Sequence, residues 1–451
     1  MFDSLWLKEC LNDMYSGGLQ DDKFALLYDI NTHVNVAIKT PVGKTERGVI
    51  KNAIIQGDVF GPLLCSKQVD NIGKECLEEE KYTYIYKGEV QIPPLGMVDD
   101  LLCITECGFK TSMMNSYINC QTNSKKLQFG VKKCKKLHVG KFCEEFKCQQ
   151  LFVDEWKEVE TINESGIVKA EELCVGEGLM EEKEEERYLG DIISQDGRNI
   201  KNIKAWISKG KGIVTKIMSI LDSIPFGNKF FKVAIILRNS LLTSSMLCNS
   251  EAWYNLTKAE LNLLETIDVM LLRKVLKAPM STPIEMLYLE LGCIPYRQLI
   301  QKRRMLFLFY ILHQKPESMI YKFFQTQLKN RNPKDWVTTV LKDIKELELN
   351  IELEDIQTMN KTSYTNMIKK IIGEKTLKEL EKRKSQHSKV RNIKHSSLRM
   401  QKYLQPNKLL IKNEESQIIF KLRCRVTEAE MNVKGIYDTN EWDLCGNTVK
   451  R

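Results

Sequence analysis

Two adjacent carboxylates, Asp99 and Asp100, lie in the stretch MVDD between two apolar segments. The segments IPPLG before them and LLCI after them favour a β-hairpin, and near its turn both acidic side chains can approach one site. Burying two acids there is costly unless a cation compensates their charge. Magnesium prefers hard oxygen ligands and uses one or two carboxylates together with substrate phosphates, which suits nucleotidyl transfer. The alternative, a pair of solvated turn residues, stays open on this pair alone.

Two further segments lie in a fixed order around the acidic pair. Residues 54–63, IIQGDVFGPL, precede it and lead into a predicted helix, and residues 122–130, TNSKKLQFG, follow it with an Asn-x-x-Lys pattern that we expect to be a strand. A QG…GPL segment, an xxDD hairpin and an Asn-x-x-Lys strand in this order resemble the successive palm motifs of reverse transcriptases from non-LTR, LINE-like retroelements.

Further stretches extend this resemblance over about residues 1–315, with a weaker similarity at the C-terminal end. They are similar to the invertebrate endonuclease–reverse transcriptase group. The stretches are FDSLWLKECLNDMY, QVDNIGKECLEE, KKLQFGVKKCKKLHVG, RYLGDIISQDGRN, NSEAWYNLTKAELNLLETIDVMLLRK and STPIEMLYLELGCIPYR.

The resemblance implies a role for each motif residue. Asp99 and Asp100 would help to hold two magnesium ions that activate the primer 3′-hydroxyl and stabilise the pyrophosphate leaving group. Gln56 and Gly57 would border the incoming nucleotide and the template, where glycine permits close approach of the backbone. Lys126 would lie near the triphosphate and stabilise its charge or donate a proton. An ordinary turn glycine and a surface lysine are the alternatives for Gly57 and Lys126.

One metal ligand of the family is not matched in this sequence. The family places an aspartate several residues before a Phe-Asp dipeptide, which corresponds here to Phe2-Asp3, so the matching aspartate is expected before Met1. Asp3 matches the later acid of that motif, and nothing in the spacing supports a substitution by Asp58. Because two carboxylates supply too few oxygens for two ions, we expect the chain alone to be inactive.

The elements that must position these residues follow from periodicity. The pattern to about residue 148 is α+β, with β-rich segments at 33–40, 82–90 and 136–140. Residues 180–187, MEEKEEER, are expected to form a solvated acidic turn. From Tyr188 onward the pattern is helical. Thr257 and Thr282 each precede a glutamate by three residues, which predicts two helix starts, and Gly292 predicts a stop.

The predicted architecture is α+β: an incomplete reverse-transcriptase palm built on an antiparallel sheet, a helical thumb and a mostly helical basic region. The predicted domains are a partial palm at 1–147, a connector with a hairpin and an acidic turn at 148–187, a thumb-like domain at 188–316, a helical basic region at 317–412 and a tail at 413–451 that resembles a truncated zinc knuckle. Only Cys445 is present to bind zinc there, so no zinc site is expected.

Two regions have the charge of a nucleic-acid surface. Residues 366–412 contain 14 Lys/Arg against 3 Asp/Glu, which favours contact with phosphates. Residues 198–216 place lysines around Trp206, and the resemblance matches this segment to the thumb that holds an RNA template or an RNA–DNA duplex. A solvated amphipathic helix with Trp206 packed inward is the alternative for the second region.

Composition limits the class of protein to which the chain can belong. Hydrophobic content of 43% and charged content of 28% are ordinary for a globular chain, and the net charge is +9. The 14 cysteines include no CxxC pair and are expected to be mostly reduced. No segment predicts a membrane span, a secretory signal or a small-molecule cofactor besides magnesium, so nuclear or cytoplasmic residence is expected.

Three functional hypotheses remain. The chain is an RNA-directed DNA polymerase, or a polymerase-derived protein that binds nucleic acid without catalysis, or a remnant of an element with no selected function. The ordered motifs favour the first hypothesis, and the unmatched aspartate favours the second.

Overall fold

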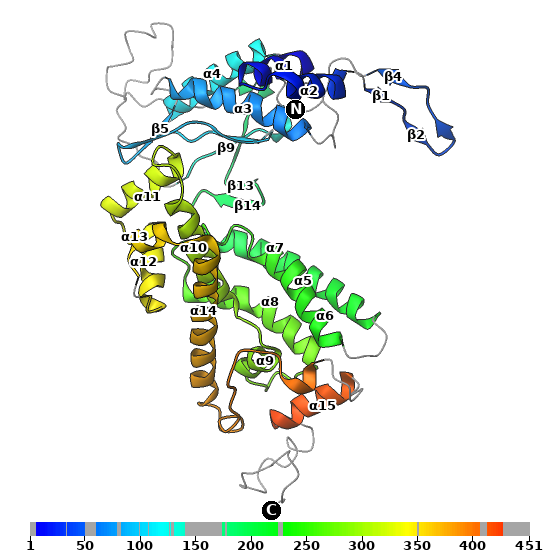
Figure 1. Ribbon diagram of the computed structural model, residues 1–451, viewed down its shortest axis with the longest axis vertical. Helices are drawn as coiled ribbons and strands as arrows, with labels where there is room; N and C mark the ends of the chain where they lie inside the picture. Colours follow the sequence, from blue (N-terminus) through cyan, green and yellow to red (C-terminus); the bar gives the residue numbers. More distant parts are fainter. Residues whose placement is uncertain are drawn as a thin grey trace, which may run out of the picture. The chain divides into compact units, whose positions relative to one another are not determined.

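The computed structural model of the chain describes residues 6–32, 34–49, 60–78, 83–98, 100–106, 108–125, 127, 130–139, 174–175, 178–223, 229–349, 351–405 and 413–426 (Figure 1). Two compact units divide the chain, Met1–Arg198 and Asn199–Arg451. The described residues combine many helices with small, mainly antiparallel sheets, which agrees with the mixed helix and strand pattern predicted from the sequence.

The first unit has a core of helices, because apolar side chains recur at helical spacing in its N-terminal half. Its helices are α1 Leu7–Ser16, α2 Asp21–Thr32, α3 Gly61–Leu77, α4 Gly108–Ser124 and the short 3₁₀ helix Val131–Lys133. Buried residues of α1, α3 and α4 pack together, among them Leu11, Leu64, Ile72, Met114 and Ile118. This core supports the strands that carry the acidic pair.

The strands of the first unit are short and pair two by two. They are β1 Asn35–Val36, β2 Lys39–Thr40, β3 Gly43–Lys44, β4 Gly48–Val49, β5 Tyr84–Tyr86, β6 Val90–Ile92, β7 Leu95–Met97, β8 Asp100–Leu102, β9 Lys135–Leu137, β10 Cys174–Val175, β11 Gly178–Leu179, β12 Glu181–Lys183, β13 Glu185–Tyr188 and β14 Asp191–Ser194. The pairs β1–β4, β2–β3, β5–β6, β7–β8, β10–β11 and β13–β14 are antiparallel, and β9–β12 is parallel. All three segments predicted to be β-rich contain strands.

The expected acidic turn at 180–187 is wrong. These residues form β12 and β13, and two acids of β12 pair with lysines of β9: Lys135 with Glu181 at 2.6 Å and Lys136 with Glu182 at 2.9 Å. A run of glutamates is unfavourable in an isolated strand, but here opposite charges face one another across a parallel pair. The partner lysines lie about 45 residues earlier in the chain, so local charge could not reveal them.

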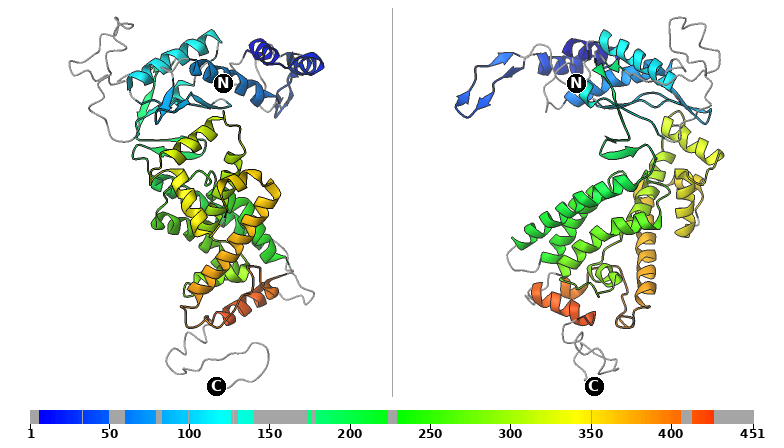
Figure 2. Two further views of the ribbon diagram at one scale, coloured as in Figure 1. Left: turned by 60° about the vertical axis from the view of Figure 1, so that its left-hand side comes forward. Right: turned by 180° about the vertical axis from the view of Figure 1, so that it is seen from behind.

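The second unit is helical. Its elements are α5 Ile200–Asp222, α6 Phe230–Leu237, a π-helical segment Arg238–Thr243, α7 Ser244–Met246, α8 Lys258–Leu276, α9 Ile284–Leu291, α10 Tyr296–Leu312, α11 Met319–Lys329, α12 Trp336–Glu346, α13 Leu353–Thr358, α14 Lys361–Lys384, a 3₁₀ turn Lys402–Leu404 and α15 Asn413–Arg423. Figure 2 shows α14 lying along α10, where Tyr364 donates a hydrogen bond to the Met305 carbonyl at 3.2 Å.

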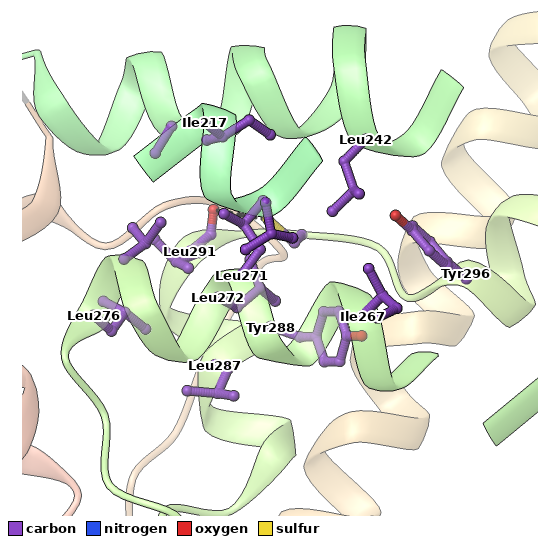
Figure 3. Close-up of a cluster of buried hydrophobic side chains, with 14 of the residues drawn as sticks. Ile217, Leu242, Ile267, Leu271, Leu272, Leu276, Leu287, Tyr288, Leu291 and Tyr296 are labelled. Carbon is purple, nitrogen blue, oxygen red and sulfur yellow. Dashed lines mark hydrogen bonds between the residues drawn. The ribbon is translucent and has the colours of Figure 1, made fainter. Parts of the chain in front are cut away.

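A large buried cluster joins α5, α8 and α9 (Figure 3). The apolar stripe predicted on α8 supplies Leu264, Ile267, Leu271 and Leu272, which are buried, while Leu261 packs at the edge. No helix among the described residues has the length and apolar character needed to cross a membrane.

Helices begin at both predicted starts, but only the first has the predicted cap. Thr257 forms a capping box with Glu260 at the start of α8. Thr282 does not cap α9, which has Pro283 at its N-cap position and begins at Ile284, and the Thr282 hydroxyl is buried without a hydrogen-bond partner among the described residues.

Gly292 ends α9 as predicted, with a φ of 66°. A Cβ at this position would overlap the backbone of Arg399 and Met400. Glycine is therefore required both by the left-handed conformation and by the close approach of a second segment.

Candidate functional site

The hairpin expected around the acidic pair is present. Strands β7 and β8 pair in the register Leu95↔Leu102, Gly96↔Leu101 and Met97↔Asp100. The Asp100 side chain is exposed, so its carboxylate is accessible to a hard cation or to a substrate. Asp99 lies outside the described residues. The structure therefore locates one member of the predicted pair.

The turn of this hairpin has an unusual backbone conformation. Val98 has a φ of 59°, a left-handed value that costs a β-branched residue about 1–3 kcal/mol. Positive φ in a short hairpin turn matches the twist of the two strands. The Val98 carbonyl accepts a hydrogen bond from the Cys65 thiol at 3.3 Å. Helix α3 thus holds the turn in place.

Close packing between α3 and β7 also fixes the hairpin. A Cβ at Gly96 would collide with the Cγ1 atom of Val69 on α3. Any larger residue at position 96 must move the strand or the helix. The glycine in PLGMVDD therefore allows the helix to support the strand that leads to Asp100.

A second hairpin reaches the first one. Tyr188, at the end of β13, donates a hydrogen bond to the Leu95 carbonyl at 3.4 Å. Burial, and then the negative charge of Asp100, raises the pKa of the Tyr188 phenol above its ordinary value. We did not single out Tyr188 as a site residue from the sequence, although it lies in the stretch RYLGDIISQDGRN that carries the family resemblance.

The other predicted site residues, Gln56, Gly57 and Lys126, lie outside the described residues. The segment that follows Gln56 and Gly57 leads into a helix as predicted, because α3 begins at Gly61 with Pro62 in its first turn.

The strand expected at Asn-x-x-Lys is wrong at its first residue, since Asn123 belongs to the last turn of α4. The helix continues to Ser124 because Met114, Ile118 and Thr122 lie at helical spacing and are buried. The next strand, β9, begins only at Lys135. Lys125 pairs with Glu75 of α3 at 3.4 Å.

The metal chemistry expected of this site can be compared with the donors present. An exposed aspartate at a hairpin tip is a suitable oxygen ligand for magnesium when substrate phosphates complete the coordination. Within the residues that the structure describes, no group of three or more His, Cys, Asp or Glu side chains is arranged to hold a metal ion. Asp99, the second candidate magnesium ligand, is not among those residues, and neither is Cys445, at which no zinc site is expected.

The helical unit carries a basic surface on α5. From residue 200 to residue 250 the sequence has eight Lys/Arg and one acid, Asp222. Lys204, Lys211 and Lys216 are exposed. Trp206 is buried and stacks on Trp253, with ring centroids 4.5 Å apart. The tryptophan therefore packs inward, as the alternative interpretation expected, while the lysines face outward.

An open groove of about 350 Å³ lies beside this surface. Its lining contains one cation, three hydroxyls and two aliphatic side chains: Lys216, Ser240, Ser244, Ser245, Ile213 and Leu241. None of the described residues that line the groove is a carboxylate, so it is suited to an anionic, partly apolar chain.

Part of the predicted basic tract at 366–412 is used inside the fold. The Lys384 side chain is buried and bonds to the Glu381 carboxylate at 2.7 Å and to the Ile393 carbonyl. His395 is buried between Glu290, at 3.0 Å, and Glu381, at 2.8 Å. These residues act within the interior, which a count of charges in the sequence could not indicate.

Nine of the described cysteines are free thiols, as expected. Burial, followed by the charge of Asp13, raises the pKa of the Cys10 thiol to about 12. No protein-family model matches the sequence, and a search of curated proteins finds no match.

Proposed function

We propose that this chain forms the palm and thumb of a reverse transcriptase of the non-LTR retroelement type. The observation that supports it best is the β7–β8 hairpin with Asp100 at its tip. It follows a helix that starts at the GPL motif, in the order of the family's motifs. Cys65, Gly96 and Tyr188 hold it from two sides, and a catalytic carboxylate needs such support to keep its position.

In this proposal the acidic pair works with the substrate's own phosphates. Bound magnesium would supply activation of the primer 3′-hydroxyl and charge stabilisation at the leaving pyrophosphate. Asp99 and Asp100 contribute the carboxylate oxygens, while Gln56, Gly57 and Lys126 border the nucleotide. Since two carboxylates offer few ligands for two ions, low or absent polymerisation by this chain alone is part of the proposal.

Primer extension on an RNA template with magnesium tests this function. The variant Asp99→Asn/Asp100→Asn is compared with Asp21→Asn/Asp22→Asn, which removes two adjacent exposed acids from α2. Extension by the parent and the control, with loss in the first variant, supports the polymerase. Equal extension by all three chains would show that Asp99 and Asp100 are not needed for polymerisation. No extension by any of them agrees with the low activity expected of this chain alone and does not favour the polymerase over the second candidate.

The second candidate is binding of nucleic acid without catalysis. It is favoured by the acid-poor face of α5 and by the groove beside Lys216. Lys211→Gln/Lys216→Gln is expected to weaken binding of an RNA–DNA duplex and to lower its salt dependence. The control is Lys322→Gln/Lys334→Gln, which makes the same charge change on exposed residues elsewhere in the helical unit. It is expected to leave the duplex affinity and its salt dependence unchanged. If the chain binds nucleic acid without catalysis, Asp99→Asn/Asp100→Asn is expected to bind the RNA–DNA duplex as tightly as the parent or more tightly.

A further inference from the structure

Residues 34–49 form a two-stranded ribbon with no core of its own. The pairs β1–β4 and β2–β3 run antiparallel, and none of the side chains described between 34 and 48 is buried. Ile38 is 65% exposed and Val42, at the tip, is 98% exposed. Figure 1 and the rear view in Figure 2 show the ribbon extending away from the helices of its unit. An isolated ribbon of this kind is marginal in water, so it is suited to a partner that covers it.

The charges of the ribbon indicate the chemistry of that partner. Lys39 lies directly opposite Lys44 in the β2–β3 register, and like charges in this position destabilise a strand pair. Arg47 adds a third cation, whereas Glu46 is the only acid between residues 34 and 49. In the described part of the chain none of these three cations forms an ion pair. An anion bound between the two lysines would relieve their repulsion.

Hydrogen bonds hold the tip in one register. The Thr45 amide donates to the Ile38 carbonyl at 3.0 Å, and the Ile38 amide donates to the Thr45 hydroxyl at 2.9 Å. The Thr40 hydroxyl donates to the Gly43 carbonyl at 3.0 Å. Both lysines are therefore presented side by side on one face, with Val42 projecting from the turn between them.

We propose that this ribbon is an arm that docks on a nucleic-acid strand, with Lys39 and Lys44 binding backbone phosphates and Val42 contacting sugar or base. Two adjacent cations match the repeated single charges of a phosphodiester chain, and the apolar tip matches its less polar parts. The inference rests on the ribbon and does not depend on polymerase activity or on the groove beside α5.

Binding of the full chain to a fluorescent 30-nucleotide single-stranded RNA, measured by anisotropy over a series of KCl concentrations, tests the arm. Lys39→Gln/Lys44→Gln is compared with Lys8→Gln/Lys23→Gln, two exposed lysines on α1 and α2 of the same unit. Loss of two phosphate contacts is expected to lower the slope of log affinity against log salt by about 1.4, because each contact on a single strand contributes about 0.7. The control is expected to keep the parent slope. Loss of the lysine repulsion is not expected to destabilise the ribbon, and a thermal midpoint no lower than that of the parent verifies that the variant is folded.

A photo-crosslinking residue in place of Val42 gives a second readout. Adducts with the RNA are expected, and adducts only with a second copy of the chain would overturn the inference. Equal slope changes in both lysine variants, or none in either, would also overturn it. So would displacement of the RNA from the parent by polyglutamate at equal charge concentration, because an acidic polypeptide would then be the fitting partner. Failure of these tests leaves the primer-extension and α5 results unaffected.

Discussion

The carboxylate of Glu290 joins several segments of the helical unit. Buried on α9, it accepts hydrogen bonds from Arg423 of α15 at 3.0 Å and from Tyr403 at 2.7 Å, and it contacts His395 at 3.0 Å. A buried charge is tolerable only when it is paired and fully hydrogen-bonded, and these partners meet that condition. All three lie more than 100 residues later in the chain.

Removal of this charge is expected to weaken the fold. Glu290→Gln leaves Arg423 without its carboxylate partner and removes one of the two carboxylates that contact His395, and it is expected to lower the free energy of unfolding by about 3 kcal/mol. The measurement is urea unfolding followed by circular dichroism. Glu285→Gln is the control, because the half-buried Glu285 pairs at 3.5 Å with His387, whose side chain is exposed to solvent, and a change below about 1 kcal/mol is expected for it. Equal losses in the two variants would contradict the role given to Glu290.

The same carboxylate predicts a pH dependence. Burial raises its pKa, but the hydrogen bond from His395 and the charge of Arg423 outweigh burial, so the pKa of Glu290 is lowered. A lowered pKa stabilises the fold fully above the unfolded value, about 4.3, and this stability is lost as the pH falls through the folded value. The difference in unfolding free energy between the parent and Glu290→Gln is thus expected to be constant from pH 7 to about 5 and to shrink below pH 4. If the difference in unfolding free energy grew on acidification, the pKa of Glu290 would be raised in the folded state and not lowered.

At the scale of elements, the two Thr-x-x-Glu sequences are a matched pair with different outcomes. Thr257→Ala removes the cap of α8 and is expected to cost about 1 kcal/mol of stability. Thr282→Ala removes a buried hydroxyl that has no partner among the described residues and is expected to cost little or to stabilise the fold. Urea midpoints of the two variants against the parent provide the measurement. A larger loss for Thr282→Ala would mean that this hydroxyl bonds in solution.

Local sequence was sufficient where the deciding contacts are local. The hairpin at residues 95–102, the helix after GPL, the capping box at Thr257 and the stop at Gly292 depend on neighbours within a few residues, and all were predicted. The strands at 181–188 and the buried roles of Lys384 and His395 depend on partners far along the chain. The support of the acidic hairpin by Cys65 and Tyr188 is equally non-local, so the sequence indicated the site but not what holds it.

At the scale of the whole molecule, each unit has its own hydrophobic core. Helices α1, α3 and α4 enclose one in the first unit, and the second unit contains two larger clusters around α5–α8–α9 and α10–α12–α14. A unit that buries its own core can fold without the rest of the chain. The second unit also contains the whole of the Glu290 network and the Trp206–Trp253 stack.

The fragment 199–451 is therefore expected to fold alone. Its tryptophan fluorescence should change in one cooperative urea transition at the midpoint that the full chain shows for the same signal, and Glu290→Gln should lower that midpoint equally in both. If binding resides on α5, the fragment should retain salt-dependent binding of an RNA–DNA duplex and lose it with Lys211→Gln/Lys216→Gln. A fragment that unfolds without cooperativity would show that the first unit stabilises the second. One that folds but does not bind would place nucleic-acid contact in the first unit, with the ribbon and the acidic hairpin.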